Sequence, residues 1–172
     1  MKLIFSIFLA LSVFGAGGAA QSVCRAELTD APVLFNLKLG ISPAAAQSVL
    51  GKDLKIKNKR NGEYTFFQNF IERKATGSLA NVRALYLRFY EGALYQIEIF
   101  YEDEPDAQTL ENFINLQTAK FNLPREAWKI KYGIAEINCG AFSLAADKFL
   151  NSRVELTDES VRAKVTDARK RN

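Results

Sequence analysis

The chain of 172 residues contains no histidine, only two cysteines and a single tryptophan. The absence of histidine excludes a Ser-His-Asp or Cys-His catalytic site and most zinc sites. Two cysteines are too few for a cluster of metal-binding thiolates. Hydrophobic residues make up 48% of the chain and charged residues 24%, a balance typical of a globular protein rather than a disordered, coiled-coil or multi-span membrane protein. We find no motif for catalysis, a metal or a cofactor.

The first twenty residues have the pattern of a secretory signal peptide. Lys2 supplies positive charge ahead of an uncharged apolar run, residues 3–14, and a stretch of glycine and alanine follows. The small residues Gly18 and Ala20 predict cleavage before Gln21. The alternative is an uncleaved anchor, because the apolar stretch reaches the lower length limit of a membrane span. We expect cleavage, and hence a periplasmic or secreted protein with no stable membrane span.

The balance of charge argues against nucleic acid as a partner. The chain has 23 Lys and Arg residues against 19 Asp and Glu residues. The two signs are mixed along the sequence, whereas a nucleic-acid-binding domain concentrates basic residues on one face. We therefore expect a protein or another macromolecule of the cell envelope as partner, and no nucleic acid.

Export changes the interpretation of Cys24 and Cys139, which are the two cysteines of the chain. An oxidising compartment and an even cysteine count favour a disulfide bond between them. Such a bond would close a long loop and tie down the start of the mature chain. The alternative is two free thiols. Because the chain has neither histidine nor a Cys-x-x-Cys pair, Cys139 is not expected to be a nucleophile.

Apolar periodicity and turn residues predict a chain that alternates helices with runs of strands. Helices are expected at 43–50, where Ser42-Pro43 begins and Gly51 ends the element, over about 110–121, and from Thr157 onward. Strands are expected over residues 33–39, 53–59, 64–71, 82–90, 93–101, two or three within 128–146, and 153–156. Consecutive strands joined by short turns pair antiparallel.

This order predicts an α+β fold, with one or more antiparallel sheets and two or three helices packed on one side. We divide the chain into a signal peptide, 1–20, and a single α+β domain, 21–172. A finer division of that domain gives two helix-plus-meander halves, about 34–101 and 102–168.

The segment 37–43 (LKLGISP), followed by Val49, Leu50 and Gly51, resembles the strand–helix opener LG-M-[ST]-x-x-x-V-x-x-LG of several secreted bacterial proteins. It is similar to the small outer-membrane lipoproteins of the SmpA/OmlA type, to the β-lactamase-inhibitor-protein-like fold, and to uncharacterised secreted families with the same opener. The pattern covers roughly residues 34–101. The chain lacks the lipobox cysteine, and it has a second half that the small lipoproteins lack. The resemblance implies a non-enzymatic envelope or inhibitory binding module.

Two strands joined at Glu91-Gly92 are expected to gather aromatic side chains on one face. A two-residue turn would place on that face Tyr86, Arg88, Tyr90, Tyr95, Ile97, Ile99 and Tyr101. The other face, expected to be the core, would carry Leu85, Leu87, Phe89, Leu94, Gln96, Glu98 and Phe100. Tyr and Arg are typical of protein-binding surfaces, so the candidate partner surface consists of Tyr86, Arg88, Tyr90 and Tyr95. The alternative is that helices or other strands cover these tyrosines.

A second candidate is the basic patch of Lys55, Lys57, Lys59 and Arg60. Alternation would place the three lysines on one face near a hairpin tip. That face either contacts phosphate, lipid headgroups or an acidic protein, or belongs to an edge strand, where lysine discourages aggregation. The acidic run 102–106 lacks the spacing of a calcium loop and is expected to precede the second helix as a solvated segment.

These observations predict an exported, non-enzymatic binding module that uses a sheet face to contact a macromolecular partner and needs no cofactor. The alternative is a hydrolase or transferase that relies on carboxylate, serine, lysine or tyrosine groups. Catalysis requires groups that converge on one point, and no spacing in the sequence indicates such a site.

Overall fold

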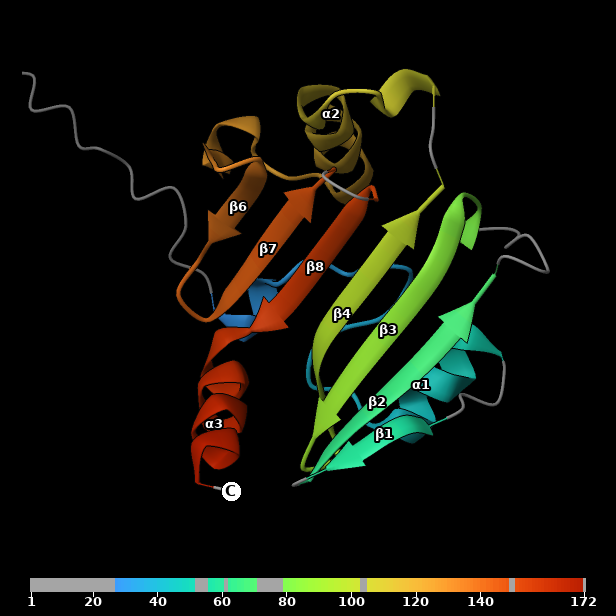
Figure 1. The fold of residues 1–172 in the computed structure, drawn as a ribbon, viewed down its shortest axis with the longest axis vertical. Coiled ribbons are helices and arrows are strands. Elements are labelled where there is room, and N and C mark those ends of the chain that lie inside the picture. Colours follow the sequence, from blue (N-terminus) through green and yellow to red (C-terminus); the bar gives the residue numbers. More distant parts are fainter. Residues whose placement is uncertain are drawn as a thin grey trace, which may run out of the picture.

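A single antiparallel sheet forms the centre of the protein, in a computed structural model that describes residues 27–51, 56–60, 62–70, 79–102, 105–148 and 151–171 (Figure 1). Its strands are β1 (Ile56–Arg60), β2 (Glu63–Asn69), β3 (Val82–Tyr90), β4 (Ala93–Tyr101), β5 (Lys129–Lys131), β6 (Ile134–Asn138), β7 (Phe142–Asp147) and β8 (Arg153–Asp158). The helices are α1 (Pro43–Leu50), α2 (Leu110–Phe121) and α3 (Glu159–Lys170). The predicted α+β class is confirmed. The predicted signal peptide lies outside the described residues.

The sheet consists of two consecutive meanders that meet in its middle. The spatial order of the eight strands is β1-β2-β3-β4-β8-β7-β6-β5, and every neighbouring pair is antiparallel. Helix α1 precedes the first meander, and α2 precedes the second. The pair β4–β8 is the contact between the two, so the centre of the sheet joins segments far apart in the sequence. The strands β1 and β5 are its edges.

Local capping explains where the helices begin and end. Oγ of Ser42 accepts a hydrogen bond from the amide of Ala45, and Gly51 ends α1 in the left-handed conformation. The predicted helices 43–50 and 110–121 are confirmed. The last helix begins at Glu159 rather than Thr157, because the chain stays extended in β8 until the carboxylate of Asp158 caps α3.

The predicted strand 33–39 is wrong. Leu34 and Leu37 form an isolated antiparallel bridge, with reciprocal backbone hydrogen bonds of 3.1 and 2.9 Å. Between them Phe35 and Asn36 take positive φ values of 54° and 64°, so the chain reverses after two residues. The alternating apolar residues therefore mark a tight turn whose two leucines are fully buried in the core.

The hydrophobic core lies between one face of the sheet and the helices α1 and α2. Ala46 of α1 and Phe113 and Ile114 of α2 belong to the same buried cluster as the leucines of β3. Val165 of α3 is also buried, but it lies outside this cluster. Figure 1 accordingly shows the sheet in front of α1, with α3 beside one end of the sheet. No helix among the described residues is long and apolar enough to cross a bilayer.

A β-bulge in β4 corrects the predicted division between the two sheet faces. Glu91 and Gly92 do form a two-residue turn with positive φ, and Phe89 pairs with Leu94. The next pair, however, joins Arg88 to Gln96, so Tyr95 is an extra residue in β4. Beyond this bulge every side chain of β4 changes face relative to the prediction.

The bulge has two consequences for the predicted faces. Residues expected beside the tyrosines are instead part of the core, namely Ile97, Ile99 and Tyr101. Residues expected in the core lie on the opposite face, namely Gln96, Glu98 and Phe100. A hairpin without a bulge would pair Arg88 with Tyr95 and Tyr86 with Ile97. Arg88 instead pairs with Gln96, and Tyr86 pairs with Glu98.

Candidate functional site: the open face of the sheet

The sheet face opposite to α1 and α2, which we call the open face, is crossed by a network of charged side chains. Glu98 lies at its centre on β4, with only 8% of its side chain exposed. Its Oε2 lies 3.2 Å from Nη2 of Arg88 on β3, and its Oε1 lies 2.9 Å from Nη1 of Arg153 on β8. A buried carboxylate without such partners would be strongly destabilising. Two arginines, one from each neighbouring strand, therefore compensate the charge of Glu98.

A second carboxylate faces Glu98 across the junction of the two meanders. Glu155 of β8 is the direct cross-strand partner of Glu98, and like charges in this position repel each other. Nη1 of Arg153 lies 3.5 Å from Glu155, and Nε2 of Gln96 donates a hydrogen bond of 2.7 Å to its Oε1. Arg88 in turn donates to Oε1 of Gln96. The network thus offsets the repulsion between its two opposed carboxylates.

Arg153 is held on its other side by Asp147 of β7. Its Nη2 lies 2.7 Å from Oδ2 of Asp147, and its Nε donates to the same oxygen at 2.7 Å. Burial by itself lowers the pKa of Arg153, but the hydrogen bonds from Arg153 to Glu98 and Asp147 outweigh it, and the pKa is raised. Because 30% of its side chain remains exposed, Arg153 also presents a permanent positive charge to solvent.

This network is better suited to present fixed charges than to exchange protons. A general acid or base needs a carboxyl group that can reach a substrate proton. Glu98, Glu155 and Asp147 each accept hydrogen bonds from neighbouring side chains of the protein itself. Two facing carboxylates therefore form part of a closed network on a sheet face.

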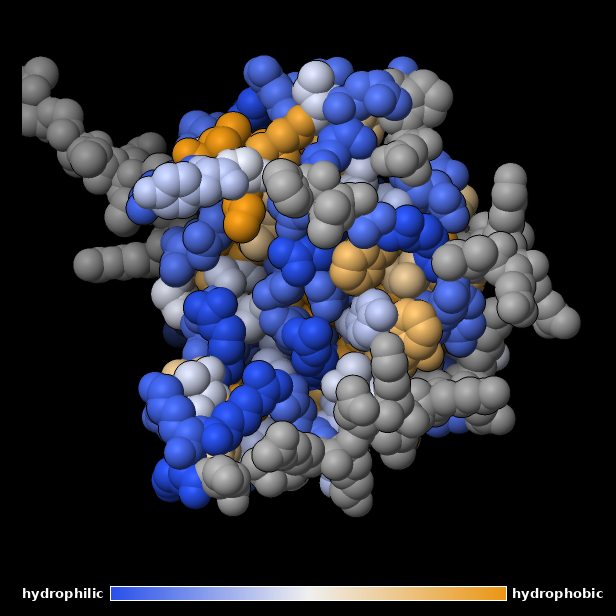
Figure 2. Space-filling view, viewed as in Figure 1, coloured by the Kyte–Doolittle hydropathy of each residue, from blue (hydrophilic) through white to orange (hydrophobic). Residues whose placement is uncertain are grey.

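Aromatic side chains lie beside the network on three neighbouring strands. The ring centroid of Tyr86 on β3 is 4.5 Å from that of Phe67 on β2 and 5.7 Å from that of Phe100 on β4. All three side chains are half-buried. Figure 2 shows this side of the molecule, with hydrophilic side chains in the middle of the view and hydrophobic ones beside them. Arginine next to aromatic rings is the composition of a protein-binding surface.

One end of the open face is closed by α3. The hydroxyl of Tyr95 donates a hydrogen bond of 2.6 Å to Oε1 of Glu63 on β2. Nη2 of Arg169, near the end of α3, lies 2.6 Å from Oε2 of the same carboxylate. At the start of α3, Ser143 of β7 donates to Glu159. The helix is therefore attached at both its ends to strands of the open face.

The contacts of Tyr95 and Arg169 with Glu63 shift the pKa values of both groups. Burial raises the pKa of Tyr95, and the hydrogen bond to Glu63 and the charge of that carboxylate raise it further. The pKa of Arg169 is raised mainly by its hydrogen bond to Glu63. Tyr95 therefore remains protonated and Arg169 remains charged, which maintains both contacts at neutral pH.

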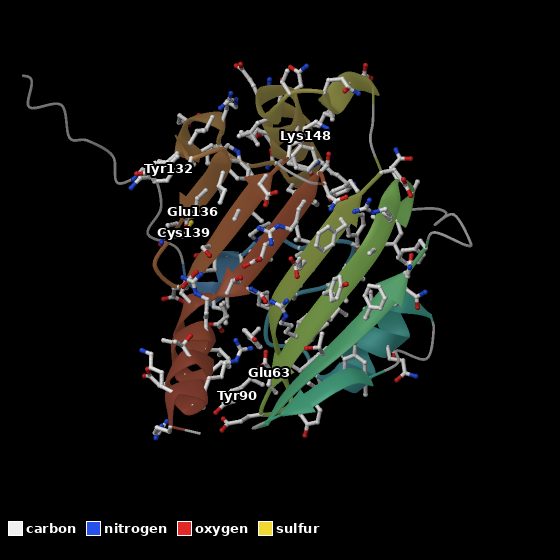
Figure 3. The ribbon with its side chains drawn as sticks, viewed as in Figure 1. Glu63, Tyr90, Tyr132, Glu136, Cys139 and Lys148 are labelled. Atoms are coloured by element: carbon white, nitrogen blue, oxygen red, sulfur yellow. The ribbon has the colours of Figure 1, made fainter. Side chains whose placement is uncertain are left out.

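The structure divides the predicted partner surface. Tyr86, Arg88 and Tyr90 lie half-buried on the open face, whereas Tyr95 is only 3% exposed. Figure 3 shows Tyr90 beside Glu63 at one end of the sheet. Tyr95 is thus not an accessible contact residue, because the bulge places it against Glu63. For Tyr86, Arg88 and Tyr90, contact with a partner remains a prediction.

The predicted basic patch lies on an edge strand. Lys57, Lys59 and Arg60 belong to β1, the outermost strand beside β2, and Lys55 lies outside the described residues. The pairing of β1 shifts between Ile56 and Asn58, so the regular alternation assumed for the lysines is interrupted. The side chains of β1 lie outside the described part of the structure, and contact with an acidic partner stays a prediction.

Cys139 lies directly after β6 and is buried. Its predicted partner, Cys24, lies outside the described residues. The described part of the chain contains no free cysteine, which is consistent with the predicted bond. The pairing of Cys24 with Cys139 stays a prediction.

The residues that organise this face are not apparent from the sequence. Regular alternation places Glu98 in the core, and Arg153, Glu155 and Glu63 are not among the predicted site residues. Only the position of the bulge would have brought Glu98 to the side of Arg88. Arg153 and Glu155 alternate with the apolar Val154 and Leu156 in β8, and Gln96 and Glu98 alternate with Ile97 and Ile99 in β4; these patterns are the available signals.

A cavity of about 200 Å³ lies apart from the open face, among Leu28, Thr29, Ala31, Lys38 and Leu39. It is smaller than most small-molecule sites. Among the described residues, no group of three or more Cys, Asp or Glu side chains is arranged to hold a metal ion. Comparisons with family models, with curated proteins and with solved structures find no match for this chain.

Proposed function

We propose that the protein is an exported, non-enzymatic binding module of the cell envelope, and that the open face of its sheet contacts a macromolecular partner. The observation that carries this proposal is the pair Arg88 and Arg153 in the middle of the open face. Their side chains are 32% and 30% exposed, although each is hydrogen-bonded to Glu98. Guanidinium groups that are held in place before binding lose little conformational freedom when a partner arrives.

The half-buried aromatic side chains support the same proposal. Phe67, Tyr86 and Phe100 stand on three adjacent strands, and their mutual contacts fix the orientation of the rings. Rigid aromatic groups beside arginine supply most of the binding energy in protein interfaces. The module would therefore bind a polar, partly aromatic or aliphatic protein surface rather than a small molecule.

Catalysis by carboxylate, serine, lysine or tyrosine groups remains the alternative function. It would require a carboxyl group with free access to a substrate. The carboxylates of the open face are engaged by Arg88, Gln96 and Arg153 instead, and this engagement favours binding.

Site-specific photo-crosslinking in the producing cells tests the proposal. A benzoylphenylalanine at Phe100, on the open face, is expected to give one discrete adduct with a protein of the envelope fraction. The same group at Leu116, an exposed apolar position on α2, serves as the matched control. An adduct from Phe100 alone supports the proposal. Identical adducts from both positions, or none from Phe100, would contradict it.

Export is tested separately by mass spectrometry of the protein from fractionated cells. The expected product lacks residues 1–20 and occurs in the periplasm or the medium. A protein that retains Met1 and remains in the cytoplasm would refute export, whatever the crosslinking shows.

A further inference from the structure

The hairpin of β5 and β6 concentrates exposed hydrophobic side chains at one edge of the sheet. Ile130, Tyr132 and Ile134 are 55%, 91% and 43% exposed. They make up half of the large hydrophobic residues that are strongly exposed in the described part of the chain. Single exposed apolar residues are ordinary, but a group of them marks an interaction site. This edge is separate from the aromatic residues of the open face.

Tyr132 is held in a conformation that presents its ring to solvent. It forms the hairpin turn with Gly133, and both residues have positive φ, 53° and 77°. A tyrosine adopts this conformation less readily than the asparagine or glycine usual in such turns. Figure 3 shows Tyr132 at the outer border of the molecule, near Glu136. An aromatic ring is thus kept at a position that local backbone preference does not favour.

The strand beside this turn is an edge with hydrogen-bonding capacity. β5 is the last strand of the sheet, and its three residues are all exposed. In the described part of the chain no strand pairs with its outer side, so that side can accept an additional strand. The short length of β5 and its two lysines limit unspecific pairing. These two features do not explain why the apolar side chains of Ile130 and Tyr132 are exposed at this edge.

The charges on β5 indicate which kind of additional strand could pair with its outer side. Lys129 and Lys131 take part in none of the ion pairs found among the described residues, and Nζ of Lys131 lies 5.0 Å from the centroid of the Tyr132 ring. Their cross-strand partners are Glu136 and Ile134, so both lysines share one face of the sheet, and Ile130 lies on the other. A second copy of this chain, paired antiparallel about Ile130, would place lysine opposite lysine. An acidic strand would place carboxylates there instead.

We propose that β5 and Tyr132 form a docking site for an extended acidic segment of another protein, which adds to the sheet next to β5. The segment alternates acidic residues, opposite Lys129 and Lys131, with apolar residues on the face of Ile130. Backbone hydrogen bonds hold the segment, the lysines select its charge, and Tyr132 covers its apolar side. This site does not depend on the function proposed for the open face.

The test measures binding of synthetic octapeptides to the full chain by fluorescence anisotropy. The probe alternates valine and glutamate, and the control peptide has lysine in place of glutamate. We expect the acidic probe to bind and the basic peptide not to bind. The double substitution Lys129→Glu/Lys131→Glu should weaken the acidic probe about tenfold, as two exposed charge pairs allow, and improve binding of the basic peptide. Lys164→Glu/Lys170→Glu on α3 makes the same change in net charge and should have little effect.

Two further measurements test the mode of binding. A probe that is N-methylated at alternate residues cannot donate backbone hydrogen bonds along one edge, so it should lose binding if the segment pairs with β5. Tyr132→Ser should weaken the unmodified probe while leaving the melting temperature nearly unchanged, because the side chain is exposed.

Several results would overturn the proposal. These are absence of binding by the acidic probe, binding that none of the hairpin substitutions changes, and binding that survives N-methylation. Self-association of the protein that Ile130→Glu abolishes would identify a second copy as the occupant. Adsorption to phosphatidylglycerol vesicles that depends on Tyr132 would identify a lipid surface. The crosslinking at Phe100 is independent of all these results.

Discussion

At the scale of the residue, the open face shows how buried polar groups are kept in a protein. Glu98, Gln96 and Tyr95 are almost fully buried on a face without a hydrophobic core, and each has a named partner. A buried polar group is costly unless its hydrogen bonds are formed, and removing a partner leaves the other group desolvated. The same contacts that orient Arg88 and Arg153 toward solvent therefore also stabilise the fold.

Substitution of Glu98 by glutamine tests this double role. Glutamine keeps the shape of the side chain, but its amide nitrogen is a donor and meets one of the two arginines. We expect a loss of about 2 kcal/mol in the free energy of unfolding, below the value for a fully buried pair because the arginines are partly exposed. Urea denaturation measures the change. Glu111→Gln is the control, since Glu111 is 72% exposed and 3.6 Å from Arg125; it should cost less than about 0.5 kcal/mol. Equal effects would contradict the role of Glu98.

The raised pKa of Tyr95 leads us to expect that the free energy of unfolding decreases at alkaline pH. Its pKa is raised in the folded protein, so the folded state holds the phenolic proton more tightly than the unfolded state does. The resulting stabilisation is complete below the unfolded pKa of about 10 and is lost as the pH rises above it. Tyr95→Phe should destabilise the protein by about 1 kcal/mol at pH 7. It should also remove part of the decline in stability above pH 10.

The measurement is urea denaturation at a series of pH values from 7 to about 11, compared between the wild type and the variant. Tyr132→Phe is the matched control, because Tyr132 is 91% exposed. Tyrosinate absorbance of the folded wild type and of Tyr95→Phe should differ by one tyrosine, whose titration lies above pH 10 because the pKa of Tyr95 is raised. Tyr132→Phe should leave the pH dependence of the free energy of unfolding unchanged. If Tyr95→Phe leaves it unchanged as well, the contact of Tyr95 with Glu63 does not contribute to the pH dependence of stability.

At the scale of the element, the sequence predicts those helices and turns whose ends are set by neighbouring residues. The caps Ser42 and Gly51 define α1, and the apolar stripe of α2 led to its observed bounds. The bulge at Tyr95 leaves only a change of phase in the sequence, because the apolar Leu94 has the same parity as the polar Gln96 and Glu98, whereas Ile97 and Ile99 have the other. It arises from pairing with β3 and from the hydrogen bond to Glu63, 32 residues away in the sequence. One extra residue exchanged the two faces over half of a strand.

Turns of unusual composition were the second source of error. Phe35 and Asn36 reverse the chain between Leu34 and Leu37, although phenylalanine is uncommon at positive φ. Burial of both leucines offsets this local preference, because the turn packs onto the core. A pattern that counts only apolar residues therefore reads the segment as a strand. The pattern of apolar residues also does not predict the charged network of the open face, because the partners of each charged side chain come from other strands.

The start of α3 provides a prediction for a whole element. Oδ1 of Asp158 accepts hydrogen bonds from the amide of Val161 at 3.0 Å and from the hydroxyl of Ser160 at 2.8 Å. Asp158→Ala should therefore lower the free energy of unfolding by about 1 kcal/mol. Asp158→Asn keeps a capping oxygen and should lose less. Hydrogen exchange of the α3 amides should increase in the alanine variant ahead of those in β3. Uniform change across the sheet would argue against a local role.

At the scale of the whole molecule, the charged network stands on the junction between the two meanders. Glu98 belongs to the first meander, and Arg153, Glu155 and Asp147 belong to the second. The pairing of β4 with β8 and the core cluster shared by α1 and α2 cross the same junction. Groups buried in one half therefore have hydrogen-bond partners in both halves, and the sheet should unfold as one cooperative unit.

The predicted disulfide between Cys24 and Cys139 would add a covalent connection across this unit. Cys24 precedes the first meander, and Cys139 lies within the second, directly after β6. Closing a loop of this length contributes about 5 kcal/mol in the chain-entropy model, which corresponds to a decrease of about 15 °C in melting temperature when the bond is reduced. Alkylation with and without prior reduction, followed by mass spectrometry, measures the bond directly. The variant Cys24→Ser should reproduce the thermal loss and leave Cys139 unreactive in the folded state, because this side chain is buried. A mass that reduction does not change would show that the two thiols are not joined, and the first described residues would then be held by the packing of Leu28, Ala31, Leu34 and Leu37 against the core.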